Sequence, residues 1–211
     1  MQTLDLRKTL KHLYNPSPKQ PVIVDVPSFQ FVTVEGAIEP SMEPGTSPSF
    51  AAALEALYGI SYTLKFMSKQ RAEDPIDYGV MPLEALWWIE QGDFDIRIKD
   101  NWCWRAMIMQ PDHITAEMFD AALAKLRKKR DGGAGLDLLR FGRFEEGTSV
   151  QVMHLGPYSE EPATLDRMRT FVEEQGYRLH LLHHEIYLGD PRRGAPEKLK
   201  TVLRHPVERA G

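Results

Sequence analysis

The chain of 211 residues is long enough to bury a core and to form one large domain or two small ones. Hydrophobic residues make up 42% and charged residues 27%, as in globular proteins, and the net charge of −4 gives no general attraction to nucleic acid or anionic membranes. A single cysteine, Cys103, excludes an intramolecular disulfide and a multi-cysteine zinc site. The sequence shows neither a signal-peptide pattern nor an apolar run of about 18 residues, so we expect a cytoplasmic protein without a membrane span.

The first 34 residues predict an arm followed by extended chain. Residues 1–20 contain leucines in a possible short helix and then prolines that stop it, so we expect an N-terminal arm laid on the body of the protein. Residues 22–34 alternate around Pro27, with Phe29 and Phe31 on one face, which predicts a strand or a pair of short strands.

The next segment predicts a long helix and two strands. Ser47 and Pro48 are typical of a helix start, and the apolar spacing places Tyr62 on the buried face of the helix that follows. Residues 78–89 form an apolar run that ends in two tryptophans, and residues 102–109 predict a further strand.

Residues 115–131 predict a connecting helix. Thr115 is a typical N-cap, an apolar face follows, and basic residues at 128–130 lie in the last turn, where they complement the helix dipole. Two glycines follow and can end the helix without steric cost. The basic residues therefore indicate a helix end rather than a phosphate site.

The order strand, helix, strand, strand then appears a second time. Residues 150–155 predict a strand, and Ser159 caps a helix with Glu161 in its first turn. Residues 177–188 predict one long strand, and residues 200–207 predict the last strand.

These elements predict an α+β fold of two strand–helix–strand–strand modules with antiparallel sheets. The first repeat covers about residues 22–110 and the second about 148–208, within a domain that we place at 21–211 after the arm. A loose alignment of the third elements matches Glu84 with Glu185. A repeat of this kind predicts pseudo-twofold halves with a ligand cleft between them.

Four stretches resemble the GyrI-like small-molecule-binding family. They are residues 77–88 (DYGVMPLEALWW), 104–115 (WRAMIMQPDHIT), 154–164 (HLGPYSEEPAT) and, most specifically, 183–207 (HHEIYLGDPRRGAPEKLKTVLRHPV). The resemblance extends over nearly the whole chain. It implies a duplicated module related to the effector domains of multidrug-sensing transcription regulators.

The resemblance implies two functions that would use the same cleft. One is the binding of bulky hydrophobic, often cationic, aromatic molecules over a central glutamate, as in drug or toxin sequestration. The other is hydrolysis, because some members of the family open the cyclopropane ring of DNA-alkylating toxins. Residues 1–20 hold no basic recognition helix, so we expect no direct binding of nucleic acid. The natural ligand and the oligomeric state are not readable from the sequence.

Glu185 is the central candidate because it lies midway along an otherwise apolar strand. Alternation places His183 and Tyr187 on its face of the strand, and His184 and Ile186 toward the helices. An unpaired buried carboxylate would cost several kcal/mol, so Glu185 is either a hydrogen-bonded structural element or exposed to a cavity. In a partly dry pocket its pKa would rise, which suits a general base.

Aromatic side chains complete the predicted site. Tyr158 and Tyr187 are the candidates for a catalytic proton donor in cyclopropane opening, in which Glu185 activates the attacking water. The same three residues and His183 are candidates for ligand binding, although Tyr158 also suits a loop packing role. Three tryptophans suit either the walls of the cleft or the core: Trp88, Trp102 and Trp104.

The histidines near Glu185 do not form a metal motif. They lack the HExxH spacing, and adjacent strand residues point to opposite faces, so we expect neither a metal nor another cofactor. Cys103, between two tryptophans, is expected to be buried and inert. Residues 190–193 (DPRR) predict a turn after the strand.

Overall fold

The residues described by the computed structural model are 1–92, 94–98, 101–130, 135–189 and 194–211. The predicted turn at 190–193 and the last residue of the predicted connecting helix, at 131, lie outside them. The chain forms two compact units: the first comprises residues 1–9, 29–81 and 100–144, and the second comprises residues 10–28, 82–99 and 145–211.

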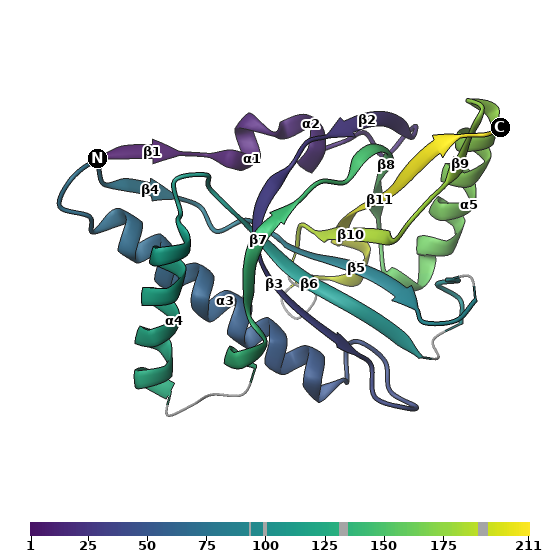
Figure 1. Ribbon diagram of the computed structural model, residues 1–211. Helices are drawn as coiled ribbons and strands as arrows, with labels where there is room; N and C mark the ends of the chain where they lie inside the picture. The colour runs from purple at the N-terminus through teal and green to yellow at the C-terminus, as the bar shows by residue number, and fades with distance from the viewer. Residues whose placement is uncertain (93, 99–100, 131–134, 190–193) are drawn as a thin grey trace. The chain divides into compact units, whose positions relative to one another are not determined.

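The first unit is built on a three-stranded antiparallel sheet and two long helices (Figure 1). The sheet order is β6 (Trp102–Gln110), β3 (Phe29–Ala37) and β7 (Arg140–Phe144). A separate parallel pair joins β1 (Gln2–Leu4) to β4 (Ile76–Tyr78). The helical elements are α1 (Leu6–Thr9), α3 (Pro48–Lys69), α4 (Ala116–Arg130) and the 3₁₀ turn η1 (Leu136–Leu138), and α3 packs beside α4.

The second unit is built on a five-stranded antiparallel sheet. Its order is β2 (Val22–Val26), β8 (Gly147–Leu155), β11 (Lys200–Arg209), β10 (His183–Tyr187) and β5 (Leu83–Ile89). The short strand β9 (Tyr177–Leu179) pairs with the end of β11. The helical elements are α2 (Lys11–Tyr14), η2 (Tyr158–Glu160), α5 (Glu161–Glu174) and η3 (Pro196–Lys198), and α5 runs beside β9 (Figure 1).

The α+β class with antiparallel sheets is confirmed. The elements β3, α3, β4, β5 and β6 recur in the same order as β8, α5, β9, β10 and β11. The spatial units do not follow the two repeats, however, because β5 pairs with β10 in the second unit. In that pairing Glu185 lies opposite Ala85 and Glu84 lies opposite Ile186, so the two aligned glutamates point to opposite faces of the sheet.

The helix starts follow local hydrogen bonding. The Ser47 hydroxyl accepts a hydrogen bond from the backbone N–H of Phe50 at 3.1 Å, and the Thr115 hydroxyl accepts one from Met118 at 3.3 Å. These bonds satisfy donors that a helix cannot pair internally. The prediction for Ser159 is wrong: residues 158–160 form η2, and α5 begins at Glu161.

Two further predictions are wrong for reasons of side-chain register and backbone conformation. Tyr62 is 49% exposed, because α3 buries the face that carries Leu57, Ile60 and Leu64 instead. The predicted strand at 177–188 is divided into β9 and β10, and Leu181 between them has a φ of 58°. A left-handed leucine cannot continue a strand, and no glycine or proline marks the break.

Each unit buries its own apolar core. In the second unit, Met168 and Val172 of α5 pack on sheet residues of β8 and β11, namely Val150, Val152, Leu203 and Val207. In the first unit, Trp104 is 1% exposed and its ring lies 5.1 Å from that of Phe50. Gly36 leaves space for this indole, because a Cβ there would lie 2.4 Å from the Trp104 ring.

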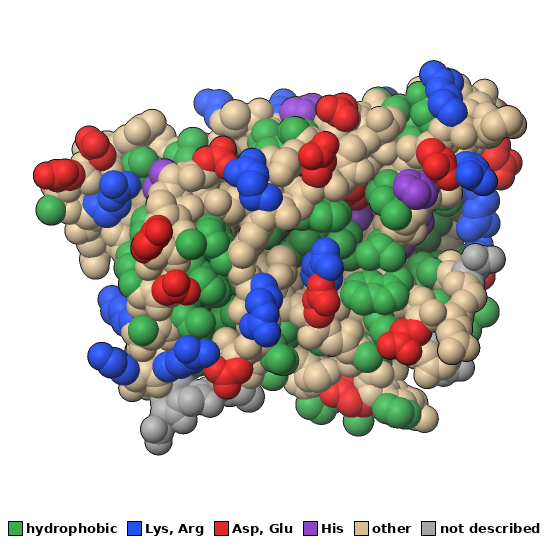
Figure 2. Space-filling model, in the orientation of Figure 1, with side chains coloured by type: hydrophobic (Ala, Val, Ile, Leu, Met, Phe, Trp, Pro, Cys, Tyr) green, Lys and Arg blue, Asp and Glu red, His purple; other side chains and the backbone are tan. Residues whose placement is uncertain are grey.

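One face of the protein is mixed in charge. On the face drawn in Figure 2, acidic and basic side chains are interspersed, with hydrophobic side chains between them. This pattern is unlike the continuous basic stripe of a nucleic-acid-binding surface. No helix among the described residues is long and apolar enough to cross a membrane.

Candidate functional site

One face of the second sheet carries Glu185 and the residues around it. Glu185 lies opposite Leu203 of β11, and Tyr187 lies opposite Thr201. Leu203 packs on α5, so Glu185 faces this helix. The expectation that His184 and Ile186 face the helix layer is therefore wrong for α5, because these two residues point to the opposite face of the sheet. We call this side of the sheet the Glu185 face.

Tyr187 is hydrogen-bonded to Glu185. Its hydroxyl donates to Glu185 Oε2 at 2.7 Å and accepts a hydrogen bond from Trp87 Nε1 at 3.0 Å. The two residues stand two positions apart on β10 and therefore share a face, as alternation predicts. Burial, together with the charge of Glu185, raises the pKa of Tyr187 well above its usual value. The Tyr187 hydroxyl thus keeps its proton at neutral pH.

His183 holds the other oxygen of Glu185. Its Nε2 lies within hydrogen-bond distance of Glu185 Oε1, at 3.1 Å. The imidazole is 2% exposed and stacks on Phe94, with ring centroids 5.7 Å apart and planes at 18°. His205 lies on the neighbouring strand β11, and its ring centroid is 5.9 Å from that of His183. Burial, together with the nearby His183, lowers the pKa of His205 to about 3. These contacts fix the orientation of Glu185.

Tyr158 lies at the exposed edge of this cluster. It belongs to η2, is 38% exposed, and meets Tyr187 edge to face with ring centroids 5.9 Å apart. Glu185 itself is 5% exposed. The structure therefore brings together four of the predicted site residues, with the carboxylate beneath a partly exposed pair of tyrosines.

Glu161, the first residue of α5, adds a second carboxyl group to the Glu185 face. It is 1% exposed, and burial, reinforced by the charge of Glu185, raises the pKa of Glu161 to about 10. The neighbouring Thr201 hydroxyl opposes this rise weakly. A helix N-terminus favours an ionised group, but here burial is the larger effect. The carboxyl group of Glu161 is consequently neutral at physiological pH.

The predicted tryptophans are distributed differently. Trp88 is half-buried and, one position after Trp87 on β5, points to the face of the sheet opposite Glu185. Trp102 and Trp104 are 5% and 1% exposed and belong to the first unit, whereas Glu185 belongs to the second. Their contact with a ligand remains a prediction.

Sequence reasoning missed Trp87, Phe94, Glu161 and Thr201. The face on which either tryptophan of the Trp87-Trp88 pair lies depends on the register of β5 against β10, which only the structure gives. The sequence places Glu161 in the first turn of a helix, where an acidic residue usually lies in solvent, and gives no signal of its burial.

The opposite face of the same sheet holds a second buried polar cluster. His184 lies between two carboxylates, 3.1 Å from Glu84 and 3.0 Å from Glu146, and Arg204 reaches Glu146 at 3.2 Å. Burial alone would lower the pKa of His184, but Glu146 and Glu84 outweigh it and raise the pKa to about 9. Tyr14 of α2 donates to Glu84 at 2.6 Å. Two cations thus balance two carboxylates.

This second cluster attaches the N-terminal segment to the sheet. Arg204 donates to the carbonyl of Leu13 at 2.9 Å, and Gln151 donates to the carbonyl of His12 at 2.6 Å. Its charged groups are paired with one another and with the backbone, which is the arrangement that buried charges require. We assign the cluster a structural role.

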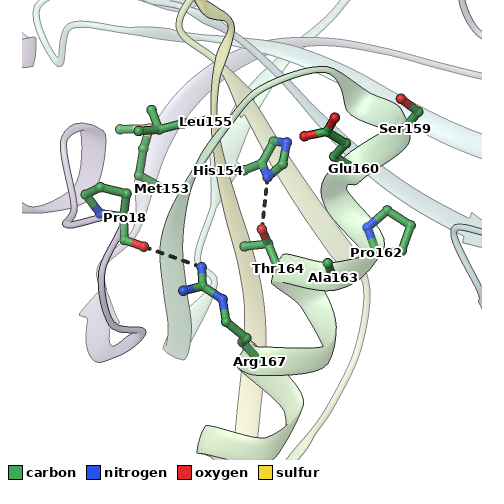
Figure 3. Close-up of a pocket in the computed structure, with 10 residues that line it drawn as sticks. All are labelled: Pro18, Met153, His154, Leu155, Ser159, Glu160, Pro162, Ala163, Thr164 and Arg167. Carbon is green, nitrogen blue, oxygen red and sulfur yellow. Dashed lines mark hydrogen bonds between the residues drawn. The ribbon is translucent and has the colours of Figure 1, made fainter. Parts of the chain in front are cut away.

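A pocket of about 690 Å³ opens between the end of β8 and the start of α5. Figure 3 shows its polar lining: His154 Nδ1 lies 2.9 Å from the Thr164 hydroxyl, and Arg167 donates to the carbonyl of Pro18 at 3.4 Å. The other nitrogen of His154 lies 3.1 Å from the carbonyl of Pro157. His154 and Thr164 are thus paired within the protein, and Glu185 is not among the residues that line this pocket.

Comparison with known proteins gives the family. The model of the GyrI-like small molecule binding domain matches residues 19–208. The chain belongs to this family. This GyrI-like domain is therefore a small-molecule-binding domain, as the sequence resemblance implies. No curated protein sequence matches the chain.

Solved structures from Listeria innocua are similar over the full length. An uncharacterized conserved protein is 39% identical with a TM-score of 0.87, over 97% of this chain and 100% of its own. A protein described as a hydrolase is 36% identical with a TM-score of 0.82, over 97% of this chain and 100% of its own. A further hydrolase is 37% identical with a TM-score of 0.86, over 98% and 100%.

Proposed function

We propose that this GyrI-like domain hydrolyses hydrophobic small molecules that contain a cyclopropane ring conjugated to a carbonyl group. Glu185 acts as the general base and Tyr187 as the proton donor. The observation that carries the proposal is the 2.7 Å hydrogen bond from the Tyr187 hydroxyl to Glu185 Oε2. Two similar proteins described as hydrolases, at 36% and 37% identity, support it.

The reaction balances as the addition of one water molecule. Glu185 takes a proton from water, and the water oxygen attacks a carbon of the strained ring. The carbon–carbon bond breaks, and its electron pair moves through the conjugated system to the carbonyl oxygen. Tyr187 gives its proton to that oxygen. The proton on Glu185 then passes to the Tyr187 phenolate along their hydrogen bond, which restores both groups.

The electrostatics of the pair make the two proton transfers depend on each other. Burial and the negative charge of Glu185 keep the pKa of Tyr187 high at rest, so the hydroxyl is a weak acid before the reaction. Once Glu185 has taken the proton of water, its charge no longer opposes ionisation of Tyr187. The indole N–H of Trp87 donates a hydrogen bond to the Tyr187 oxygen at 3.0 Å and would stabilise the phenolate form of Tyr187.

The partly exposed Tyr158 and the ring of Tyr187 give the substrate an aromatic contact surface. His183 keeps the Glu185 carboxylate in place through Oε1. We propose that Trp88, Trp102 and Trp104 add to ligand binding, as expected from the sequence.

A second candidate function is binding without turnover. An ionised carboxylate beneath two tyrosine rings also suits a bulky aromatic cation, since each ring face adds about 0.5–2 kcal/mol of cation–π attraction. In this case the protein would sequester cationic drugs or toxins, and the Tyr187–Glu185 hydrogen bond would only orient the carboxylate.

The test compares wild type with Glu185→Gln and Tyr187→Phe. A cyclopropane conjugated to a dienone serves as substrate, with water addition followed by mass spectrometry, and a fluorescent aromatic cation reports binding. We expect both substitutions to lower kcat by about 10²–10⁴-fold. Glu173→Gln and Tyr177→Phe, which lie outside the site, should retain wild-type turnover.

The outcomes separate the two candidates. Ring-opened product from wild type, and little from either site variant, supports the hydrolase. An intact cyclopropane together with dye binding that Glu185→Gln weakens supports sequestration instead. Site variants that match wild type in both assays would refute both functions.

A further inference from the structure

Two buried oxygen atoms on the Glu185 face, on Glu161 and Thr201, make no well-formed hydrogen bond with any described residue, although the Thr201 hydroxyl lies close enough to Glu161 to lower its pKa by weak hydrogen bonding. These atoms, Glu161 Oε1 and Thr201 Oγ1, are inaccessible to solvent. Both side chains are 1% exposed. Buried polar groups in folded proteins are nearly always paired, because an unpaired one loses its hydrogen bonds to water. Such atoms therefore indicate a site for a polar ligand.

Both atoms are next to the reacting pair. Thr201 lies directly opposite Tyr187 in the antiparallel register of β10 and β11, on the same face as Glu185. Glu161 reaches this face from the start of α5, close enough for the charge of Glu185 to act on it and for the Thr201 hydroxyl to affect its ionisation. All four residues belong to the second unit.

We propose that Glu161 and Thr201 bind the water molecule that Glu185 activates. This inference rests on the proposed hydrolytic function. A buried water needs two to four polar partners. Glu161 Oε1, the Thr201 hydroxyl and one oxygen of Glu185 provide three. Glu185 Oε2 already accepts a hydrogen bond from Tyr187 and Oε1 lies 3.1 Å from His183 Nε2, and a carboxylate oxygen can accept a second hydrogen bond.

The neutral state of Glu161 suits this role. An ionised carboxylate would compete with Glu185 for the proton of the water and would place two negative charges together. A neutral carboxyl group instead offers one donor and one acceptor, and the Thr201 hydroxyl offers the same. The water can then direct one proton to Glu185 while its oxygen is held for attack.

Replacing Thr201 tests the water site directly. Thr201→Val keeps the shape of the side chain and removes the hydroxyl, so kcat for cyclopropane hydrolysis should fall by about 100-fold with little change in KM. Thr201→Ser restores the hydroxyl and should recover most of the turnover. Thr148→Val, at an exposed position on β8, is the matched control and should behave as wild type.

Replacing Glu161 distinguishes water binding from proton donation. Glu161→Gln keeps a donor and an acceptor and should retain kcat within about fivefold, whereas Glu161→Leu should lose it as Thr201→Val does. If the glutamine variant is as inactive as the leucine variant, Glu161 donates a proton in the reaction and the water site as proposed is wrong.

Failure of the hydrolytic function and failure of the water site give different results. Reactions run in ¹⁸O-labelled water should add one label to the product of the wild type. If wild type gives no labelled product, the hydrolytic function and the water site both fall. If wild type hydrolyses the substrate and both Thr201→Val and Glu161→Leu stay within about twofold of it, only the water site is overturned. Circular dichroism melting shows which variants are folded, and either folded variant suffices for this comparison.

Discussion

Replacing Glu161 with glutamine should change how the stability of the protein depends on pH. In the folded state the pKa of Glu161 is about 10, and in the unfolded state it returns to its ordinary value of 4.5. Between these two values the folded state binds a proton that the unfolded state has released. Stability therefore falls as pH rises through this range, and a glutamine, which does not titrate, removes that dependence.

The magnitude follows from the shift. Each pH unit inside the window costs the wild type about 1.4 kcal/mol relative to the glutamine variant. Near pH 5 the unfolded carboxyl group still binds part of the proton, so the difference that develops from pH 5 to pH 7 is about 2.5 kcal/mol. The glutamine variant should be the more stable protein at pH 7, because it needs no proton to fold.

Urea unfolding at pH 5, 6 and 7 measures this difference. Other titrating groups are common to both proteins and cancel in the comparison. Glu160→Gln, at the preceding exposed residue, should follow the wild type across the whole range. A difference between wild type and Glu161→Gln that stays constant from pH 5 to pH 7 would refute a neutral, buried Glu161.

Three further changes probe the rest of the described structure. Arg204→Met should destabilise the protein by about 3–5 kcal/mol in urea unfolding, because it leaves the buried charge of Glu146 short of a partner. His184→Gln should flatten the pH dependence of stability between pH 6.5 and 9: the stabilisation from protonated His184 is full below 6.5 and is lost as pH rises through its folded pKa of about 9. Gly36→Ala should lower the melting temperature, with a loss of about 1–3 kcal/mol, because its Cβ would lie 2.4 Å from a tryptophan ring, whereas Gly142→Ala, with nothing within 4 Å, should not.

The sequence predicts the elements of the fold better than their pairing. Alternation and helix caps locate β3, α3 and α4 closely, because these signals are local. The pairing of β5 with β10 joins residues about a hundred positions apart, and no local pattern encodes it. The break at Leu181 is similarly invisible, since its left-handed conformation is held by the pairing of β9 and β10 with β11 rather than by a glycine.

The residues of the candidate site likewise separate into those that a local pattern indicates and those that only tertiary packing brings together. Alternation along one strand predicts that Glu185, Tyr187 and His183 share a face, and the register of β10 agrees with this. Glu161 and Thr201 come from α5 and β11, and their proximity to Glu185 depends on how these elements pack. A buried glutamate at a helix start has the same sequence pattern as an exposed one. Only burial and the missing hydrogen-bond partner distinguish it.

The two faces of the second sheet differ in how they accommodate buried carboxyl groups. On the face that carries His184 and Arg204, two cations offset the carboxylates of Glu84 and Glu146, and burial of these charges holds the N-terminal segment in place. On the Glu185 face no lysine or arginine among the described residues is hydrogen-bonded or ion-paired to the second carboxyl group, so Glu161 gives up its charge instead. A site evolved for stability alone would pair that group or replace it with an apolar residue. The proposed water site would account for the unpaired oxygen of Glu161 beside the carboxylate–tyrosine pair.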